Sequence, residues 1–152
     1  MDYQVKFKTK NKGFSLVELV IVIAIFAILA GVGDSVYYNF KTKNSLEVST
    51  NSFVQALRHA QINSEQVEGD SVWGTAIFSD KVVVFKGASY ISRDTFSDQI
   101  ADFPSGISVG GLSEIVFEKT TGWSSNVGTT TITNSNGEVK NIFINEKGTI
   151  TY

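Results

Sequence analysis

The sequence predicts an α+β fold in which one long N-terminal helix packs on an antiparallel β-sheet body. Three observations predict it. Residues 14–33 form an apolar run of helical length. No proline or glycine interrupts residues 34–68, where apolar side chains recur at helical spacing. From Gly69 onwards, short stretches rich in Val, Ile, Thr and Phe alternate with turn residues, as in strands joined by tight turns.

The apolar run is long enough to cross a membrane. Residues 14–32 would make about 28 Å of helix, close to the ~30 Å hydrocarbon core of a bilayer. Glu18 is the only charged residue in this stretch, and four lysines precede it at alternate positions from Lys6 to Lys12. The lysines should keep the N-terminus in the cytoplasm, so we expect the C-terminal body to lie outside.

Residues 34–67 read as an amphipathic continuation of the same helix. Phe53, Leu57 and Ala60 share one helical face. We expect this face to pack on the body. The whole helix is expected to run from about residue 14 to about residue 66, or about 80 Å if it is continuous.

Residues 68–152 are predicted to form the antiparallel β body. Asn136-Gly137 is expected to make a type I′ hairpin turn, because both central positions of that turn need a positive φ. Residues 87–105 look like a long irregular connection with room for a short strand. Strands are predicted at 72–78, 81–86, 107–109, 114–118, 129–133, 139–145 and 149–152.

Composition argues against catalysis and against cofactors. There is no cysteine, which excludes a disulfide framework, a thiolate metal site and a cysteine nucleophile. The single histidine, His59, falls on the predicted helix without an accompanying nucleophile motif. We therefore expect no enzyme and no catalytic residue. We also expect no metal and no cofactor, and we interpret the aspartates at 94, 98 and 102 as solvated or capping groups.

The charge distribution does not favour nucleic-acid binding. Residues 1–13 carry four lysines against Asp2, a balance of +3, so the total of −2 leaves −5 on the rest of the chain. Binding to phosphate backbones needs clustered Lys and Arg, which this acidic body lacks.

The stretch Lys12-Gly13-Phe14-Ser15-Leu16-Val17-Glu18 resembles the class III signal of type IV prepilins and type II secretion pseudopilins. In that family a membrane aspartic peptidase, the prepilin peptidase, removes a short basic leader by cutting after the glycine. The new N-terminal residue, usually Phe, is then N-methylated, and a Glu stands fifth in the mature chain. The resemblance implies that residues 1–13 are a leader, that cleavage falls between Gly13 and Phe14, and that Phe14 is methylated.

The resemblance also implies a role for Glu18, which would be the fifth residue of the mature chain. A charge at the middle of a membrane costs roughly 2.5–3.5 kcal/mol on insertion scales. Glu18 offsets that cost if it pairs with the Phe14 amine of a neighbouring subunit, which makes it an assembly contact. Ala24, Ala27 and Gly31 put small side chains on one helical face, where another helix can approach. The alternative is that small residues are simply common in membrane helices.

Two other interpretations of the N-terminus remain open. One is an ordinary secretory signal peptide that is cleaved near Ala30. The other is an uncleaved signal anchor that holds a periplasmic or surface domain. Neither gives Glu18 a role.

The body resembles the H-type minor pseudopilins, the GspH/FimT family. The segments "SFVQALRHAQINSEQ", "WGTAIF", "VVVFKG" and "ISRDTF", followed by a closing hairpin, occur in that family's order. The resemblance implies a type IV pilin-like fold and a minor pilin or pseudopilin that primes or caps a filament. The filament could belong to a type II secretion system, a twitching pilus or a DNA-uptake pilus.

The implied partners are the prepilin peptidase, other pilin or pseudopilin subunits, an inner-membrane assembly platform and membrane lipid around a single helix. The implied location is the bacterial inner membrane, and then a filament in the periplasm or at the cell surface. The alternative function is a DNA-binding minor pilin for natural transformation. In that case Lys140 and Lys147 would be the candidate contacts.

Overall fold

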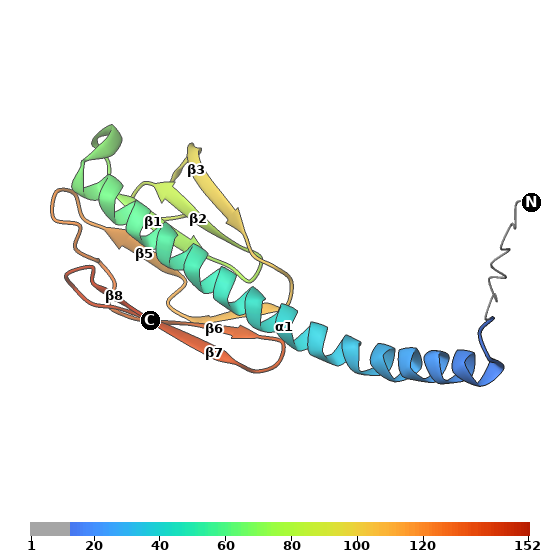
Figure 1. The fold of residues 1–152 in the computed structure, drawn as a ribbon. Helices are drawn as coiled ribbons and strands as arrows, with labels where there is room; N and C mark the ends of the chain where they lie inside the picture. Colours follow the sequence, from blue (N-terminus) through green and yellow to red (C-terminus); the bar gives the residue numbers. More distant parts are fainter. Residues whose placement is uncertain (1–12) are drawn as a thin grey trace, which may run out of the picture. The chain divides into compact units, whose positions relative to one another are not determined.

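The computed structural model describes residues 13–152, apart from the side chains of residues 32–35. Most of the predicted leader therefore lies outside the described residues. The chain divides into two units, of which the first ends at Tyr37 and the second is Tyr38–Tyr152. The fold is α+β, as predicted, with a long N-terminal helix whose C-terminal part packs on antiparallel sheets (Figure 1).

One helix, α1, spans Leu16–Glu65. It begins two residues later than predicted and ends one residue earlier. Three residues beyond the last residue of α1, the segment Glu68–Asp70 forms a short 3-10 helix, η1. Val67 and Gly69, with φ of 55° and 62°, take the left-handed conformation that ends the helical path.

The body contains two four-stranded antiparallel sheets, where the sequence predicted one. The first has the order β3-β2-β1-β5 and the second the order β4-β6-β7-β8. The strands are β1 (Trp73–Ile77), β2 (Lys81–Lys86), β3 (Asp94–Asp102), β4 (Ile107–Gly111), β5 (Glu114–Phe117), β6 (Gly128–Asn134), β7 (Val139–Ile144) and β8 (Ile150–Thr151).

The chain changes sheets between β4 and β5. The Leu112 amide still donates to Thr129 of the second sheet, at 3.1 Å, whereas the Ser113 carbonyl accepts from Ile77 of the first, at 2.9 Å. Gly111, with φ of +80°, makes this possible, because a side chain there would collide with the Thr129 backbone. Since one residue redirects the chain, the strand pattern alone did not reveal the second sheet.

The connection predicted at 87–105 contains a nine-residue strand, β3, that pairs with β2. The rest of the connection, residues 87–93, is anchored to the first sheet. Tyr90 packs on Phe78 and Phe85, at ring distances of 5.2 and 5.8 Å. Arg93 lies 3.7 Å above the Tyr90 ring and forms an ion pair with Asp98 at 2.9 Å. These side-chain contacts order a segment that has no regular apolar alternation of its own.

The predicted type I′ turn at Asn136-Gly137 is wrong. Of the two residues only Gly137 has a positive φ, +80°, and its amide donates to the Asn134 carbonyl at 3.0 Å. The loop therefore has three residues, 135–137, with the glycine in the left-handed position. The Asn134 side-chain oxygen favours the three-residue loop over a two-residue type I′ turn, because it accepts the amides of Asn136 and Glu138 at 3.1 and 2.9 Å.

The predicted packing face of the helix is confirmed. Phe53, Leu57 and Ala60 have no exposed surface. They belong to one core cluster with residues from both sheets, so α1 lies against both (Figure 1). The sheets contribute Ile115, Phe117, Ile132, Ile142 and Ile144, all fully buried.

Truncating Leu57 should destabilise the body strongly. Leu57→Ala removes a fully buried side chain and leaves a cavity, so we expect unfolding free energy to fall by about 3 kcal/mol. Urea unfolding followed by circular dichroism measures it. Arg58→Ala, an exposed neighbour on the same turn, is the control and should change stability by less than about 0.5 kcal/mol.

The second unit is expected to fold without the first. Its helix is tied to the β6–β7 loop by Tyr38, Asn39 and Thr42, and the Asn134 amide donates to the Thr42 carbonyl at 3.3 Å. A fragment of residues 38–152 should melt cooperatively with mixed helix and strand. A fragment starting at Lys43 loses these contacts and should be less stable by about 1–3 kcal/mol. A disordered spectrum for 38–152 would show that the body needs another part of the chain.

Candidate functional site

The segment Gly13–Glu18 is the first candidate site, and its geometry is set by the start of α1. The Ser15 carbonyl accepts the Leu19 amide at 3.1 Å, so Ser15 is the N-cap residue and Glu18 the third residue of the helix. Gly13 and Phe14 precede the helix without regular structure. The peptide bond between them is therefore not part of any helical hydrogen-bonding pattern.

Gly13 is not required by the packing of the chain. A Cβ atom placed on it would meet no atom of the described chain within 4 Å. Its φ is also not among the positive values that favour glycine. A glycine that the fold does not need is consistent with recognition by another molecule.

Glu18 lies in the first turn of α1. The unpaired amides of this turn and the helix dipole favour a carboxylate here, typically by 0.3–1 kcal/mol. Among the side chains that the structure describes, three ion pairs join Arg93 to Asp98, Lys119 to Asp70 and Lys140 to Glu47. Among these described side chains Glu18 is therefore not paired with a cation.

Ser15 occupies the N-cap position of α1, which the sequence analysis did not single out. The spacing Ser15-x-x-Glu18 matches the capping-box pattern, which was available in the sequence. With Ser15 at the N-cap position, Glu18 falls in the first turn of the helix.

The large apolar side chains that follow are exposed within the first unit. Phe14 is 83% exposed, and the most apolar 18-residue window of α1 has no buried residue. By length and composition this helix could cross a membrane.

The structure places Ala24, Ala27 and Gly31 on this exposed helix, at spacings of three and four residues. No described atom outside the helix backbone lies within 4 Å of a Cβ placed on Gly31. The role of Ala24, Ala27 and Gly31 in helix packing stays a prediction.

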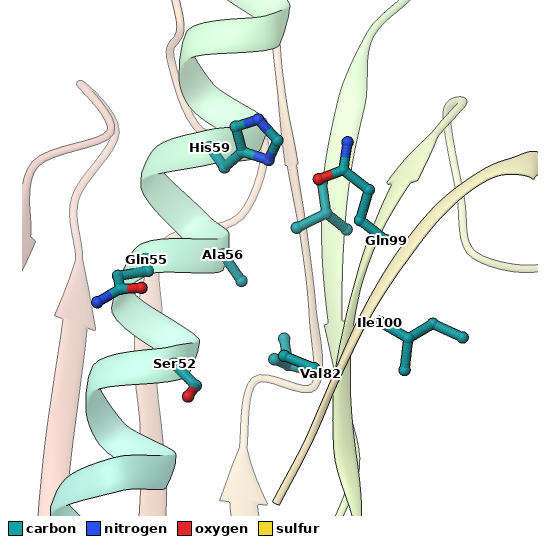
Figure 2. A pocket seen from close by; sticks show the side chains of 9 residues that line it. Ser52, Gln55, Ala56, His59, Val82, Gln99 and Ile100 are labelled. Carbon is teal, nitrogen blue, oxygen red and sulfur yellow. The ribbon is translucent and has the colours of Figure 1, made fainter.

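A groove on the body is the second candidate site (Figure 2). It has a volume of about 370 Å³ and lies between α1 and strands β2 and β3. Ser52, Gln55, His59 and Gln99 supply its polar groups, and Ala56, Val82, Val84, Ile100 and Ala101 the remainder of its lining. Figure 2 shows His59 and Gln99 on opposite walls, with Ser52 two turns of helix from His59.

This groove does not assemble a recognisable catalytic group. His59 is its one titratable lining residue, and none of the predicted site residues lines it. Two of the three aspartates considered earlier are engaged in local contacts: Asp98 pairs with Arg93, and Asp94 accepts the Phe96 amide at 3.2 Å. Among the described residues, no group of three or more His, Cys, Asp or Glu could hold a metal ion.

Residues 8–33 match the family of the prokaryotic N-terminal methylation motif. The match begins within the predicted leader and continues through Gly13, Phe14, Glu18 and the apolar part of α1 to Gly33. No curated protein and no solved structure matches the chain.

The match covers the first candidate site and leaves the body unmatched. It supports a type IV prepilin-like protein with an apolar N-terminal helix suited to membrane anchoring. It points to a structural subunit rather than an enzyme. It also implies processing by a prepilin peptidase and assembly with other pilin-like subunits.

Proposed function

We propose that this chain is a minor subunit of a type IV pilus-like filament or a type II secretion pseudopilus, and that it primes or caps that filament. It inserts into the bacterial inner membrane with its N-terminus in the cytoplasm. It is cleaved between Gly13 and Phe14 and methylated on Phe14. The observation that carries the proposal is the register of Gly13, Phe14 and Glu18 ahead of an apolar helix segment that has no buried residue.

The geometry of the helix start supports an assembly role for Glu18. Cleavage would leave an amine on Phe14, four residues before Glu18. Glu18 lies in the first turn of α1, and Phe14 immediately precedes the helix, so the amine and the carboxylate are at the same end of the chain. A neighbouring subunit shifted slightly along the helix axis would place its Phe14 amine beside the Glu18 carboxylate. In lipid, where either charge alone is costly, the pair would select this register over others.

The small residues on α1 support close contact between helices. Ala24, Ala27 and Gly31 leave the helix backbone accessible on one side. In membranes such faces allow helices to approach and gain van der Waals contact. We therefore assign this face to packing against a neighbouring subunit.

The body of the proposed subunit supports the H-type assignment through its architecture. The C-terminal part of α1 packs on antiparallel sheets that end in consecutive hairpins, β6–β7 and β7–β8. The DNA-binding alternative gains no support from the body. The Lys140 ammonium, one of its two candidate contacts, lies 3.2 Å from the Glu47 carboxylate. We therefore favour the structural role.

The test is to identify the N-terminal residue of the protein in sheared filaments. In cells that carry the matching filament machinery, mass spectrometry should find a chain that starts at N-methylated Phe14. The filament fraction should contain it in small amounts relative to a major subunit. A chain cut near Ala30, or an intact chain confined to the membrane, would contradict the proposal and support one of the two other interpretations of the N-terminus.

A further inference from the structure

A small polar pocket lies at the N-terminal end of the second unit. Its volume is about 190 Å³, and its walls come from three separate parts of the chain. Tyr38, Lys41, Thr42 and Ser45 belong to α1, Ser105 and Gly106 precede β4, and Ser135 lies in the β6–β7 loop. None of these residues is acidic, and Lys41 is the only charged one.

The hydrogen-bond donors of this pocket suit an anion. The Thr42 and Ser45 hydroxyls donate to helix carbonyls at 2.9 Å, so their protons are committed. The Tyr38 and Ser135 hydroxyls are hydrogen-bonded to each other at 3.5 Å, so one of their two protons is also committed. Three donors remain, namely the Lys41 ammonium, the Ser105 hydroxyl and whichever of the Tyr38 and Ser135 hydroxyls accepts in that bond. One cation with two hydroxyl donors matches the charge and the several acceptor oxygens of a phosphate group.

Gly106 helps to keep the pocket open. Its φ is +90°, and a Cβ atom on it would lie 3.3 Å from the Ser135 oxygen. Any larger residue would therefore crowd one of the donor hydroxyls. The volume of the pocket depends on the absence of a side chain at this position.

The position of Lys41 in the sequence indicates where the phosphate would come from. Lys41 is only eight residues beyond Gly33, the end of the apolar run, so little chain separates it from the headgroup region that borders the hydrocarbon core. A lysine side chain leans toward the helix N-terminus and reaches back several ångströms, as lysines near membrane interfaces do. Tyr38 is exposed beside it, and tyrosine is enriched at membrane interfaces.

We propose that this pocket binds the phosphate of a phospholipid headgroup on the outer face of the membrane in which the chain is anchored. Lys41 supplies the charge, and the Ser105 hydroxyl and one of the Tyr38 and Ser135 hydroxyls orient the phosphate oxygens. The contact holds the first residues of the body at the membrane surface before the subunit enters a filament. The inference rests on the proposed membrane stage of the protein and does not depend on cleavage or on filament assembly.

Lys43 provides a matched control for Lys41. It lies two residues away on the same helix, carries the same charge and is also exposed. It lines a different hollow, together with Phe40, Asn44 and Glu47, whose carboxylate disfavours an anion. General attraction to an anionic membrane should weaken equally when either lysine is neutralised. A phosphate site should respond to Lys41 alone.

The experiment measures lipid retained by the full chain in detergent micelles doped with phosphatidylglycerol, by native mass spectrometry. The wild type and Lys43→Gln should retain one lipid at similar concentrations, and Lys41→Gln should need about tenfold more, because it loses a charged hydrogen-bond donor. Ser105→Ala combined with Ser135→Ala should weaken retention in the same direction. Diacylglycerol, which lacks the phosphate, should not be retained.

Three results would overturn the proposal. Equal losses in the two lysine variants would show general electrostatic attraction. Retention of diacylglycerol would show binding through the acyl chains. Displacement by inorganic phosphate at concentrations as low as those of the lipid would assign the pocket to a free anion instead of a membrane lipid. N-terminal mass and filament content, measured on the same variants in cells, report separately on the proposed function.

Discussion

Replacing Gly13 with leucine is expected to block leader removal almost completely and to leave the full-length chain in the membrane. The peptidase implied by the motif cuts after a glycine, and the new side chain would displace the scissile bond between Gly13 and Phe14. A misplacement of about 1 Å can lower catalytic rates by about 100-fold. The fold itself should be indifferent, because a Cβ on Gly13 meets nothing within 4 Å.

The measurement is the intact mass of the membrane-extracted protein, compared between wild type and Gly13→Leu. Asn11→Leu is the control, since it places the same isobutyl side chain in the same segment two residues earlier, at a position that is not a glycine. We expect it to be cleaved. Normal cleavage of Gly13→Leu would remove Gly13 from the recognition site. Equal impairment in both variants would indicate a general sensitivity of the leader and not a requirement for glycine.

The helix and its buried face could be predicted from the sequence because both depend on local spacing. Phe53, Leu57 and Ala60 recur at intervals of three and four, and no glycine or proline interrupts residues 34–68. The helix ends just before Val67 and Gly69, which take a left-handed backbone, and of these two residues Gly69 is the local signal in the sequence. These features need no knowledge of the rest of the chain.

The arrangement of the strands could not be predicted to the same extent, because it depends on contacts between distant residues. The second sheet exists because the chain crosses over beside Gly111, where the Thr129 backbone leaves no room for a side chain. Strand β3 is ordered by pairing with β2 and by the packing of Tyr90 and Arg93. The hairpin loop was missed for a different, local reason, because the Asn134 side chain accepts the amides of Asn136 and Glu138 and favours a three-residue loop.

The N-terminal segment and the phosphate pocket also differ in how far each could be predicted from the sequence. Gly13, Phe14 and Glu18 lie within six residues, so their register could be read directly and agrees with the motif matched over residues 8–33. The phosphate pocket joins α1 to loops that begin more than 60 residues later in the chain. No spacing rule connects Lys41 with Ser105 or Ser135, so only the fold reveals them as neighbours.

Neutralising Glu18 is expected to remove the protein from filaments while leaving it in the membrane. Glu18→Ala deletes a charge from an apolar helix, so insertion should not suffer. Cleavage at Gly13 should persist. The helix loses a favourable first-turn carboxylate, which contributes about 0.3–1 kcal/mol. In contrast, a neighbouring Phe14 amine left without its counter-charge in a low-dielectric setting costs about 3–5 kcal/mol.

The difference between these two magnitudes makes the experiment decisive. A loss of about 3–5 kcal/mol corresponds to a fall of more than 100-fold in incorporation, whereas the helix effect alone gives about fivefold or less. Filament content and membrane level are measured for wild type, Glu18→Ala, Glu18→Gln and Glu18→Asp. Glutamine keeps the shape without the charge and should fail like alanine. Aspartate keeps the charge on a shorter side chain and should retain part of the incorporation.

If glutamine assembles normally, Glu18 acts through its shape and the pairing with Phe14 is excluded. If all three variants disappear from the membrane, Glu18 serves insertion or stability instead of assembly.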